Sequence, residues 1–358
     1  MDKVRLGEVA AERKETCKGS KNGFPIVGLE HLSPEEVTLS GWNENIDNTF
    51  TKLFREGDVL FGRRRAYLKK AAVAPFDGIC SGDITVIKAI PERILPELLP
   101  FVIQNDSLFD YAIEKSAGSL SPRVKWEHLR NYEFELPNLD KQRELAKVLW
   151  AMDATRNSYQ KLIQKTDYLV KGQFIDMFGE LGKNSFGFEK KPIEDVTIEL
   201  FAGGDKPVDN SVERTEEYPF PVYSNGIERD GLLCYGKEYR ISVQALTISA
   251  RGSVGYSRIR EPFFTPVVRL LTLVPNKLIN IKYLKIFIDL QNLTGTGSSQ
   301  GQLTLPEFRK IQVLLPPKET QDRFADIVEN LEKLEFELIR SLRELNSTFK
   351  KLIIQSLV

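Results

Sequence analysis

The sequence predicts a mixed α/β protein built from two similar halves: two globular bodies with short-stranded sheets, joined by two long antiparallel coiled-coil helices. Three observations predict this fold. The second half of the 358-residue chain repeats the pattern of the first, each half ends in a heptad pattern of apolar residues, and β-rich runs separated by Gly, Pro and Asn fill the remainder. At about 100–200 residues per domain, a chain of this length contains two or three domains.

The internal repeat is clearest around the two heptad segments. Without any gap, Val124 aligns with Leu303 and Gln142 aligns with Gln321, and apolar pairs fill the intervals. The hydrophobic pattern matches over about 60 residues, which is far longer than one solenoid module. We therefore expect two copies of one domain-sized design, each consisting of a variable body followed by a more regular tail.

The bodies contain several short β-rich runs and a few helical stretches. Their boundaries carry turn-forming Gly, Pro and Asn, which is typical of short strands in a mixed domain. Each body also begins with a similar short stretch, Leu6–Val9 in the first and Ile193–Val196 in the second. The expected strands are Asp58–Phe61, Ile84–Ile87, Leu246–Ile248 and Val267–Val274, and the expected short helices are Pro96–Asn105 and Ile281–Leu290.

The heptad segments predict two long helices, Asp140–Phe178 and Glu319–Leu357, each preceded by proline. At about 1.5 Å per residue, each helix would span about 50–60 Å. A single heptad pattern is also compatible with core packing or oligomerisation, but two patterns in the same register favour a pair within one chain. The residues expected at the interface of the helix pair are Leu145, Leu149, Met152, Tyr159, Ile163 and Val170, together with Phe324, Val328, Leu331, Leu338, Leu342, Leu345 and Leu352.

Composition narrows the chemistry. The chain has 50 Lys+Arg and 50 Asp+Glu, so its formal net charge is zero, which argues against a wholly basic nucleic-acid coat but permits local basic patches. Its 3 widely separated cysteines and its 2 histidines, His31 and His128, show neither a disulfide framework nor a metal-binding pattern. Sequence signatures of hydrolases, helicases and metalloproteases are missing, so we expect no catalytic residue and no metal site.

The sequence also bears on location. No run of about 18 apolar residues is present, and the first residues contain no apolar signal segment, so we expect neither a membrane span nor secretion. The sparse cysteine usage fits a reducing cytoplasm.

Basic residues cluster at corresponding places in the two bodies. In the first, five basic residues and no acid occur between Phe61 and Lys70, and in the second no acid occurs between Tyr239 and Arg260. Arginine forks and lysines suit DNA phosphates, and arginine also suits guanine edges. A cluster of this kind is commonly only a solvated face, but its recurrence in both copies favours a binding role.

Two loops of small residues, 116–123 and 295–302, precede the last strand of each body. Glycine permits close approach of a ligand to the backbone, while Ser and Gln can bond phosphates or bases. Neither loop contains the G-x-x-x-x-G-K-[ST] pattern of a nucleotide-binding loop, and simple turns remain the alternative.

Taken together, these elements resemble the specificity subunit of type I restriction-modification systems. The resemblance rests on Gly57–Arg63, Gly82–Ile87 and the tail from Gly118 to Gln142, and on the second-copy segments Ala250–Gly255 and Gly297–Gln321. It covers essentially the whole chain. No single motif decides it, but the ordered and duplicated set is specific.

The resemblance implies that residues 1–139 and 183–318 are target recognition domains, each reading one half of a bipartite sequence in double-stranded DNA. The helical regions, 140–182 and 319–358, would fix the spacer and dock two modification (methyltransferase) subunits. The chain itself would be non-catalytic and would bind no cofactor, because S-adenosylmethionine, ATP and Mg would belong to the modification and restriction subunits. The complex would act in the prokaryotic cytoplasm.

We expect DNA contacts from both the basic clusters and the small-residue loops. The alternatives are a coiled-coil scaffold without DNA readout, which predicts that exchanging residues 1–138 changes no target, and a self-contained nuclease or methyltransferase, which the missing motifs disfavour. The expected DNA-binding residues are Arg63, Arg64, Arg65, Lys69, Lys70, Ser119, Arg123 and Lys125 in the first body, and Arg251, Ser253, Tyr256, Arg258, Ser298, Ser299, Gln300 and Gln302 in the second.

Overall fold

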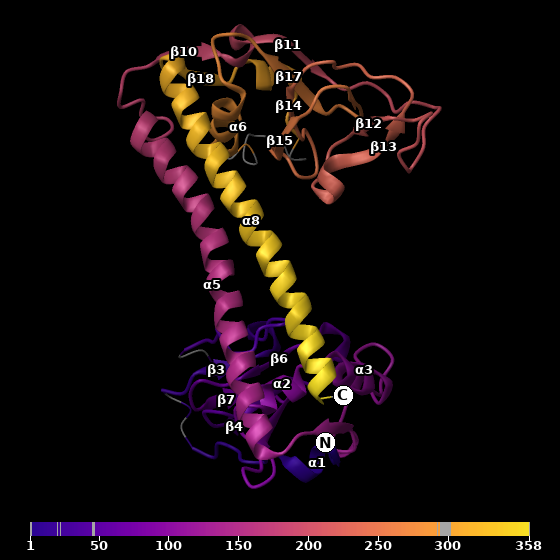
Figure 1. Ribbon diagram of the computed structural model, residues 1–358. Coiled ribbons are helices and arrows are strands. Elements are labelled where there is room, and N and C mark those ends of the chain that lie inside the picture. The colour runs from indigo at the N-terminus through magenta and orange to yellow at the C-terminus, as the bar shows by residue number, and fades with distance from the viewer. Residues whose placement is uncertain are drawn as a thin grey trace. The chain divides into compact units, whose positions relative to one another are not determined.

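The structure is a computed structural model, and it describes residues 2–19, 21, 23–44, 47–291, 293 and 302–357. The chain divides into two compact units. The first unit comprises Met1–Lys161 and Leu338–Val358, and the second comprises Leu162–Glu337. Each unit therefore contains one globular body and part of both long helices, whereas the sequence grouped the helices as separate regions. Figure 1 labels many of the elements of both units.

Each unit contains a four-stranded antiparallel sheet with the same strand order. In the first unit the order is β2-β8-β5-β6, and in the second it is β11-β17-β14-β15. In each sheet the first of the four strands along the chain lies at one edge and pairs with the last of them, and the two middle strands follow in order. The internal repeat of the sequence is therefore also a repeat of the strand order. The first sheet consists of β2 (Ala10–Glu12), β5 (Val59–Gly62), β6 (Ala71–Val73) and β8 (Ile84–Ala89), and the second of β11 (Thr197–Ala202), β14 (Ala245–Ile248), β15 (Ser257–Arg260) and β17 (Leu271–Pro275).

A second, three-stranded sheet in each unit differs between the halves. Both contain one parallel pair, β3 with β7 and β12 with β16, but the third strand joins a different partner. In the first unit β4 pairs with β7, and in the second β13 pairs with β12. These strands are β3 (Ile26–Val27), β4 (Lys52–Phe54) and β7 (Gly78–Cys80), and β12 (Phe220–Tyr223), β13 (Leu232–Gly236) and β16 (Thr265–Pro266).

A two-stranded antiparallel sheet begins and ends each body, β1 with β9 and β10 with β18. A short helical turn follows the first strand and buries Leu6 and Val9 in one unit and Ile193 and Val196 in the other, as the sequence match predicts. A second short helix, α4 or α7, precedes the last strand. The elements of this part are β1 (Asp2–Arg5), α1 (Leu6–Val9), α4 (Trp126–Leu129) and β9 (Glu133–Leu136) in the first unit, and β10 (Glu189–Pro192), η3 (Ile193–Val196), α7 (Leu305–Arg309) and β18 (Gln312–Leu315) in the second.

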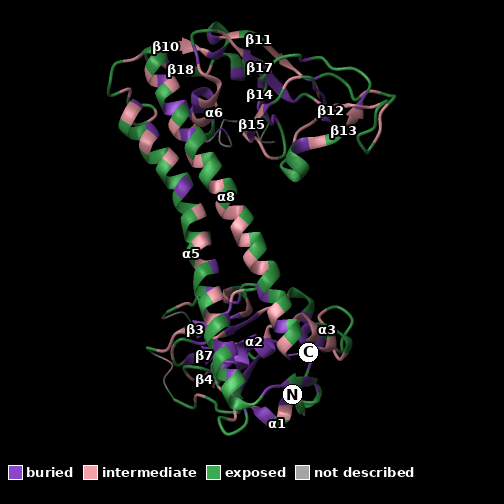
Figure 2. Ribbon diagram, viewed as in Figure 1, coloured by how far each residue is buried: buried purple, intermediate pink, exposed green. Residues whose placement is uncertain are grey.

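The two long helices are α5 (Leu139–Phe178) and α8 (Lys318–Leu357), and each begins one residue earlier than the sequence predicts. They run antiparallel, because in the second unit Phe178 at the end of α5 lies 5.2 Å, ring to ring, from Phe324 near the start of α8. Figure 2 shows that buried positions gather near the helix ends. Between the ends, most seam residues are only half-buried.

The expected interface residues are likewise more buried near the helix ends than between them. Leu145 and Leu149 are buried in the first core with Phe349 of α8, whereas Phe324 and Val328 are buried in the second core. The second core also takes Phe174 and Phe178, which the heptad pattern missed. The remaining expected interface residues, which are half-buried, are Met152, Tyr159, Ile163, Val170, Leu331, Leu338, Leu342, Leu345 and Leu352.

Two expected elements differ from the structure. The helix expected at Pro96–Asn105 is shorter, α2 (Leu99–Ile103), and a separate α3 (Asp106–Glu114) follows, because the Asn105 side chain accepts a hydrogen bond from the Ser107 N–H and caps a new helix. The strand expected at Val267–Val274 begins only at Leu271, because Val268 and Arg269 have left-handed backbones that break extended structure.

The other expected strands agree within one or two residues at each end, and α6 (Ile281–Leu290) has the expected bounds. Within the described residues, none of the helices is both long enough and apolar enough to cross a membrane.

Candidate nucleic-acid interface

The basic loop after β5 and the small-residue loop meet in the first unit. The Val124 N–H donates to the Arg63 carbonyl at 3.0 Å, and the Arg65 N–H donates to the Pro122 carbonyl at 2.8 Å. Arg64 and Arg123 therefore face each other in a short antiparallel bridge. Two segments that were singled out separately in the sequence form one surface.

An equivalent backbone contact occurs in the second unit. The Leu303 N–H donates to the Ala250 carbonyl at 2.8 Å, and Leu303 is the repeat partner of Val124. Arg251 thus takes the place of Arg64. The next residue has a left-handed backbone in both units, with φ of 54° at Arg65 and 72° at Gly252. The two halves consequently present one arginine at an equivalent point.

A carboxylate organises the arginines of the first unit. Asp83, in the turn between β7 and β8, accepts from Arg123 Nε at 2.7 Å and Nη2 at 3.3 Å, and from Arg64 Nη1 at 3.4 Å. The hydrogen bond from Arg123 contributes most to holding the pKa of Asp83 below its usual range. Arg64 Nη2 also donates to Ser121 Oγ at 3.0 Å. The guanidinium groups are therefore held in defined orientations while remaining partly exposed.

Further cations surround this surface. Lys125 is exposed, and its charge, with those of Lys14 and Arg63, adds to a backbone hydrogen bond in lowering the pKa of Glu127. Lys52 Nζ donates to the Ile84 carbonyl at 2.7 Å, and burial lowers the pKa of this lysine. Sequence reasoning missed Lys14 and Lys52, because they lie outside the contiguous basic run and no local pattern connects them to it.

The side chains of Lys69 and Lys70 bond groups of the first unit that lie outside the arginine cluster. The short turn η2 (Ala66–Leu68) lies between two left-handed residues, Arg65 and Lys69, and redirects the chain. Lys69 Nζ bonds Asp106 on α3 at 2.6 Å, and Lys70 Nζ donates to the Leu29 carbonyl at 2.8 Å. The structure thus brings Arg63, Arg64 and Arg65 together with Arg123 and Lys125, but it does not bring these two lysine side chains to them. Ser119 is exposed on the small-residue loop.

In the second unit, the expected contact residues lie on or beside the loop between β14 and β15. Arg251 is exposed and makes no hydrogen bond or ion pair with another described residue, and Ser253 is half-buried. Arg258 on β15 donates from Nε to the Tyr256 hydroxyl at 2.8 Å and pairs with Asp230 at 2.8 Å. Gln302 is exposed. Ser298, Ser299 and Gln300 lie outside the described residues.

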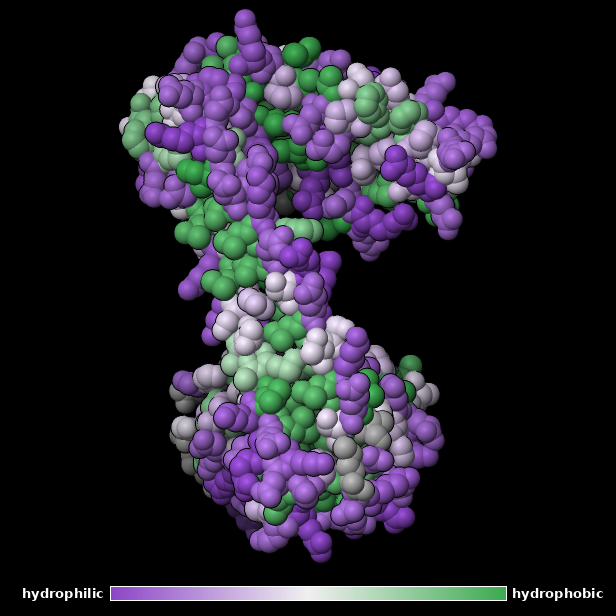
Figure 3. All heavy atoms as spheres, in the orientation of Figure 1, coloured by the Kyte–Doolittle hydropathy of each residue, from purple (hydrophilic) through white to green (hydrophobic). Residues whose placement is uncertain are grey.

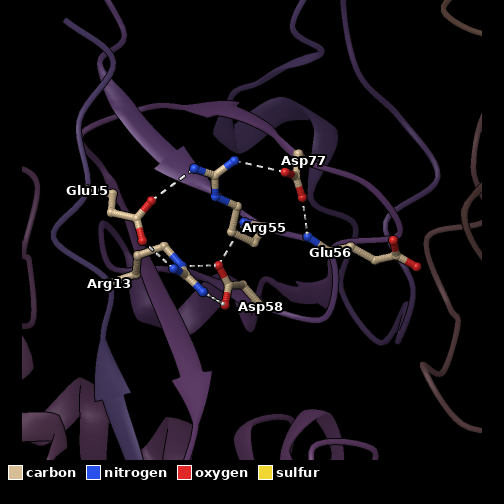
Figure 4. Close-up of polar contacts among 6 residues, drawn as sticks. All are labelled: Arg13, Glu15, Arg55, Glu56, Asp58 and Asp77. Carbon is tan, nitrogen blue, oxygen red and sulfur yellow. Dashed lines mark hydrogen bonds and ion pairs between the residues drawn. The ribbon is translucent and has the colours of Figure 1, made fainter.

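An ion-pair network fixes the strand that leads into the basic loop. Asp58, which directly precedes β5, is almost fully buried and accepts from Arg13 Nε at 2.6 Å, from Arg13 Nη2 at 3.1 Å and from the Arg55 N–H at 2.8 Å. Figure 4 shows these contacts, with Glu15 and Asp77 pairing with the two arginines at the exposed side. Because both Asp58 oxygens are occupied, the start of β5 has little freedom.

The arrangement suits binding rather than catalysis. Partly exposed guanidinium groups beside small residues can bond DNA phosphates and base edges. Among the described residues, no group of three His, Cys, Asp or Glu side chains could hold a metal ion. His31 Nδ1 accepts from the Gly28 N–H at 2.9 Å, and His128 is exposed.

Comparison with known proteins gives the family. The model of the family described as type I restriction modification DNA specificity domain matches residues 1–166 and 187–346, which is most of the chain and both of its halves. The chain belongs to this family. It is a specificity subunit, which is the non-catalytic component of a type I restriction-modification system.

Individual relatives agree with this assignment. A Mycoplasma pneumoniae protein named as a type I specificity subunit is 27% identical over 261 residues, which cover 70% of this chain and 68% of the relative. A Methanocaldococcus jannaschii protein named as the specificity subunit of a type I restriction enzyme is 21% identical and covers 100% of this chain and 90% of its own. The crystal structure of the M. genitalium type I S subunit has the same fold, with a TM-score of 0.66 at 13% identity over 98% of this chain and 94% of that one.

Proposed function

We propose that each unit of this specificity subunit reads one half of a bipartite sequence in double-stranded DNA. One observation carries the proposal: in both units the residue after the small-residue loop, Val124 or Leu303, bonds the loop that follows the third strand of the four-stranded sheet, and Arg64 or Arg251 comes next in that loop. A surface duplicated within one chain fits a target with two halves. The three-stranded sheets differ, which fits two halves of different sequence.

The long helices would then act as a ruler between the half-sites. Each is continuous for 40 residues, or about 60 Å. Half-sites about 10 base pairs apart lie about 34 Å apart on one side of the duplex, which a helix of this length can span. Residues of both helices are buried in each core, which supports a helical spacer between the two bodies.

The helices would also dock two modification (methyltransferase) subunits. Several apolar side chains remain exposed on them, among them Leu162, Leu169 and Ile175 of α5 and Leu334 and Phe336 of α8. Figure 3 shows such side chains on the visible face along the helices. Exposed apolar surface of this kind is typical of protein interaction sites. S-adenosylmethionine would bind to the modification subunits, and ATP and Mg to the restriction subunits of a full complex in the prokaryotic cytoplasm.

The decisive experiment maps methylated sites across the genome with the native gene, without it, and with residues 1–138 exchanged for those of another family member. We expect a bipartite motif that disappears without the gene and changes in one half with the exchange. A motif that survives both changes would instead favour a scaffold without DNA readout.

The ruler has its own test. Removing Asn157–Ile163 from α5 and Ile339–Leu345 from α8 takes one heptad from each helix and keeps the seam in register. Seven residues correspond to about 10 Å, so we expect the spacer to shorten by about 3 base pairs. An unchanged spacer in the methylated motif would exclude the ruler.

A further inference from the structure

Two aspartates lie among the arginines of the candidate interface, where a negative charge opposes DNA binding. Asp83 bonds Arg123 and Arg64 in the first unit, and Asp230 accepts from Arg258 Nε at 3.0 Å and from the Tyr256 hydroxyl at 2.7 Å in the second. Neither residue belongs to the basic pattern in the sequence. Their presence calls for a physical reason.

The backbone holds Asp83 firmly before its side chain bonds anything. Its N–H donates to Ser81 Oγ at 3.2 Å, and its carbonyl accepts from the Arg63 N–H at 3.0 Å. Asp230 is held in a comparable way, because its carbonyl accepts from Arg260 Nη2 at 2.6 Å and Arg260 is buried. Each aspartate is therefore anchored through its backbone, so its carboxylate projects from a defined place.

The contact with Arg123 leaves a defined part of the guanidinium available. Asp83 takes the edge formed by Nε and Nη2, so the edge that includes Nη1 remains for another partner. A guanidinium edge with two parallel N–H groups matches the O6 and N7 acceptors of guanine, or two phosphate oxygens. Asp83 thus fixes the direction in which Arg123 can bond.

Stability alone does not account for this arrangement. The side chains of Asp83, Arg64 and Arg123 are 23%, 37% and 43% exposed, and ion pairs at such sites contribute little to folding because solvent screens them. The same carboxylate repels DNA phosphates. Orienting a flexible side chain before binding lowers the entropic cost of the bound geometry and so favours the correct partner.

We propose that Asp83, and Asp230 in the second unit, are positioning residues that raise sequence discrimination at the expense of general DNA affinity. The proposal rests on the proposed function. It predicts opposite effects on two quantities, because removing the charge strengthens attraction to any DNA, whereas freeing the arginines weakens the preference for the correct bases.

The test measures binding of the complete complex with its modification subunits to two duplexes, one with the methylated motif and one with its first half-site scrambled. For Asp83→Asn we expect the ratio of the two affinities to fall about tenfold, within the range that one bidentate base contact supplies. Binding to the scrambled duplex should stay equal or become tighter. Asp83→Glu should restore the weaker scrambled binding but not the full ratio, because its longer side chain displaces the carboxylate.

Asp110→Asn is the matched control, since it removes one exposed negative charge from α3 of the same unit and should leave the ratio unchanged. An unchanged ratio in Asp83→Asn, or weaker binding to both duplexes together with a lower Tm, overturns the positioning role. Arg123→Gln keeps the two hypotheses apart. If that variant binds both duplexes normally, the proposed interface itself is wrong; if it loses discrimination while Asp83→Asn does not, only the positioning role is wrong.

Discussion

Gln142 and Gln321 make the same buried bridge at the starts of α5 and α8. Each side-chain amide donates to the carbonyl of a proline five residues earlier, Pro137 or Pro316, at 2.8 Å. Each amide oxygen accepts a backbone N–H from the body, that of Leu95 at 2.9 Å or of Asn280 at 2.8 Å. The two side chains are 2% and 0% exposed, so each long helix is joined to its body through a buried glutamine.

Replacing either glutamine with methionine keeps the volume but leaves a proline carbonyl and a backbone N–H unpaired, and Gln321→Met also frees the Leu278 carbonyl. Because each such group costs about 1–3 kcal/mol, we expect Gln142→Met and Gln321→Met each to lower the free energy of unfolding by about 2–6 kcal/mol. Chemical denaturation of the isolated chain measures this loss. Gln164→Met, at an exposed position of α5, should cost less than about 0.5 kcal/mol. Equal costs at all three positions would contradict the bridge.

Asp58 is the buried centre of the network that precedes β5. In Asp58→Asn the Arg13 guanidinium loses its buried charged partner and keeps only the exposed Glu15, and we expect about 1.5–3 kcal/mol lower stability, the typical worth of a hydrogen bond to a charged group. Asp77→Asn removes an exposed partner of Arg55 in the same network and should cost at most about 1 kcal/mol. Thermal unfolding measures the Tm of both variants, and we expect a lower Tm for Asp58→Asn. A similar Tm for the two would show that the buried Asp58 contributes no more to stability than the exposed Asp77.

Asp153 and Arg156 form a buried ion pair on α5, with side chains 3% and 8% exposed and a 2.6 Å contact. The Arg156 guanidinium lies over the Phe349 ring of α8, 5.5 Å from its centroid. Arg156→Met strands a buried carboxylate, so we expect a loss of about 3–5 kcal/mol at neutral pH, most of which the double variant with Asp153→Leu should recover.

A double-mutant cycle in chemical denaturation measures the coupling between these two residues. Arg143→Met breaks an exposed pair with Asp140 at the same three-residue spacing and should change stability by less than about 0.5 kcal/mol. A double variant that is no more stable than Arg156→Met alone would contradict the expected relief.

Glu335 interrupts the apolar seam of α8 and makes stability depend on pH. Burial, followed by the charges of Asp167 and Glu332, raises the pKa of its carboxyl above the ordinary value of 4.5, although Arg258 and Lys285 oppose this. The folded state therefore binds this proton more tightly than the unfolded state. Its contribution to stability is greatest below the unfolded pKa and is lost as pH rises through the folded pKa.

We expect Glu335→Gln to be more stable than the native chain near pH 7, by less than about 1 kcal/mol because solvent screens a half-buried group. The advantage should shrink as pH falls toward 4.5. Urea denaturation between pH 4.5 and 7.5 measures it. Glu344→Gln, at an exposed position of the same helix, should show no such trend, and a Glu335→Gln advantage independent of pH would rule out the raised pKa as its cause.

The regular parts of the fold could be predicted because their patterns repeat locally. Heptad spacing located α5 and α8 to within one residue at their starts, and the aligned pair Val124 and Leu303 makes equivalent backbone contacts in the two units. Phe174 and Phe178 were missed for a physical reason. The end of α5 packs against its body as well as against α8, so its buried face departs from a strict heptad.

The candidate interface was only partly predictable. Arg64 and Arg123 carry visible charge in the sequence, but their shared partner Asp83 is 40 residues from Arg123, and nothing local connects the two. Lys69 belongs to the same basic run as Arg64 and still bonds Asp106 instead. Its left-handed backbone, unusual for lysine, turns the chain there, and residue type gives no warning of that conformation.

The division of α8 between the two units has a consequence for the order in which the protein folds during synthesis. The second unit lies wholly within Leu162–Glu337, whereas the first also requires Phe349, Ile353 and Leu357 to complete its core. Synthesis runs from the N-terminus to the C-terminus. Every residue of the second unit is therefore made before the C-terminal residues that complete the first unit. Until they emerge, the core that contains Leu145 and Leu149 is incomplete, and its exposed apolar side chains favour aggregation of the nascent chain.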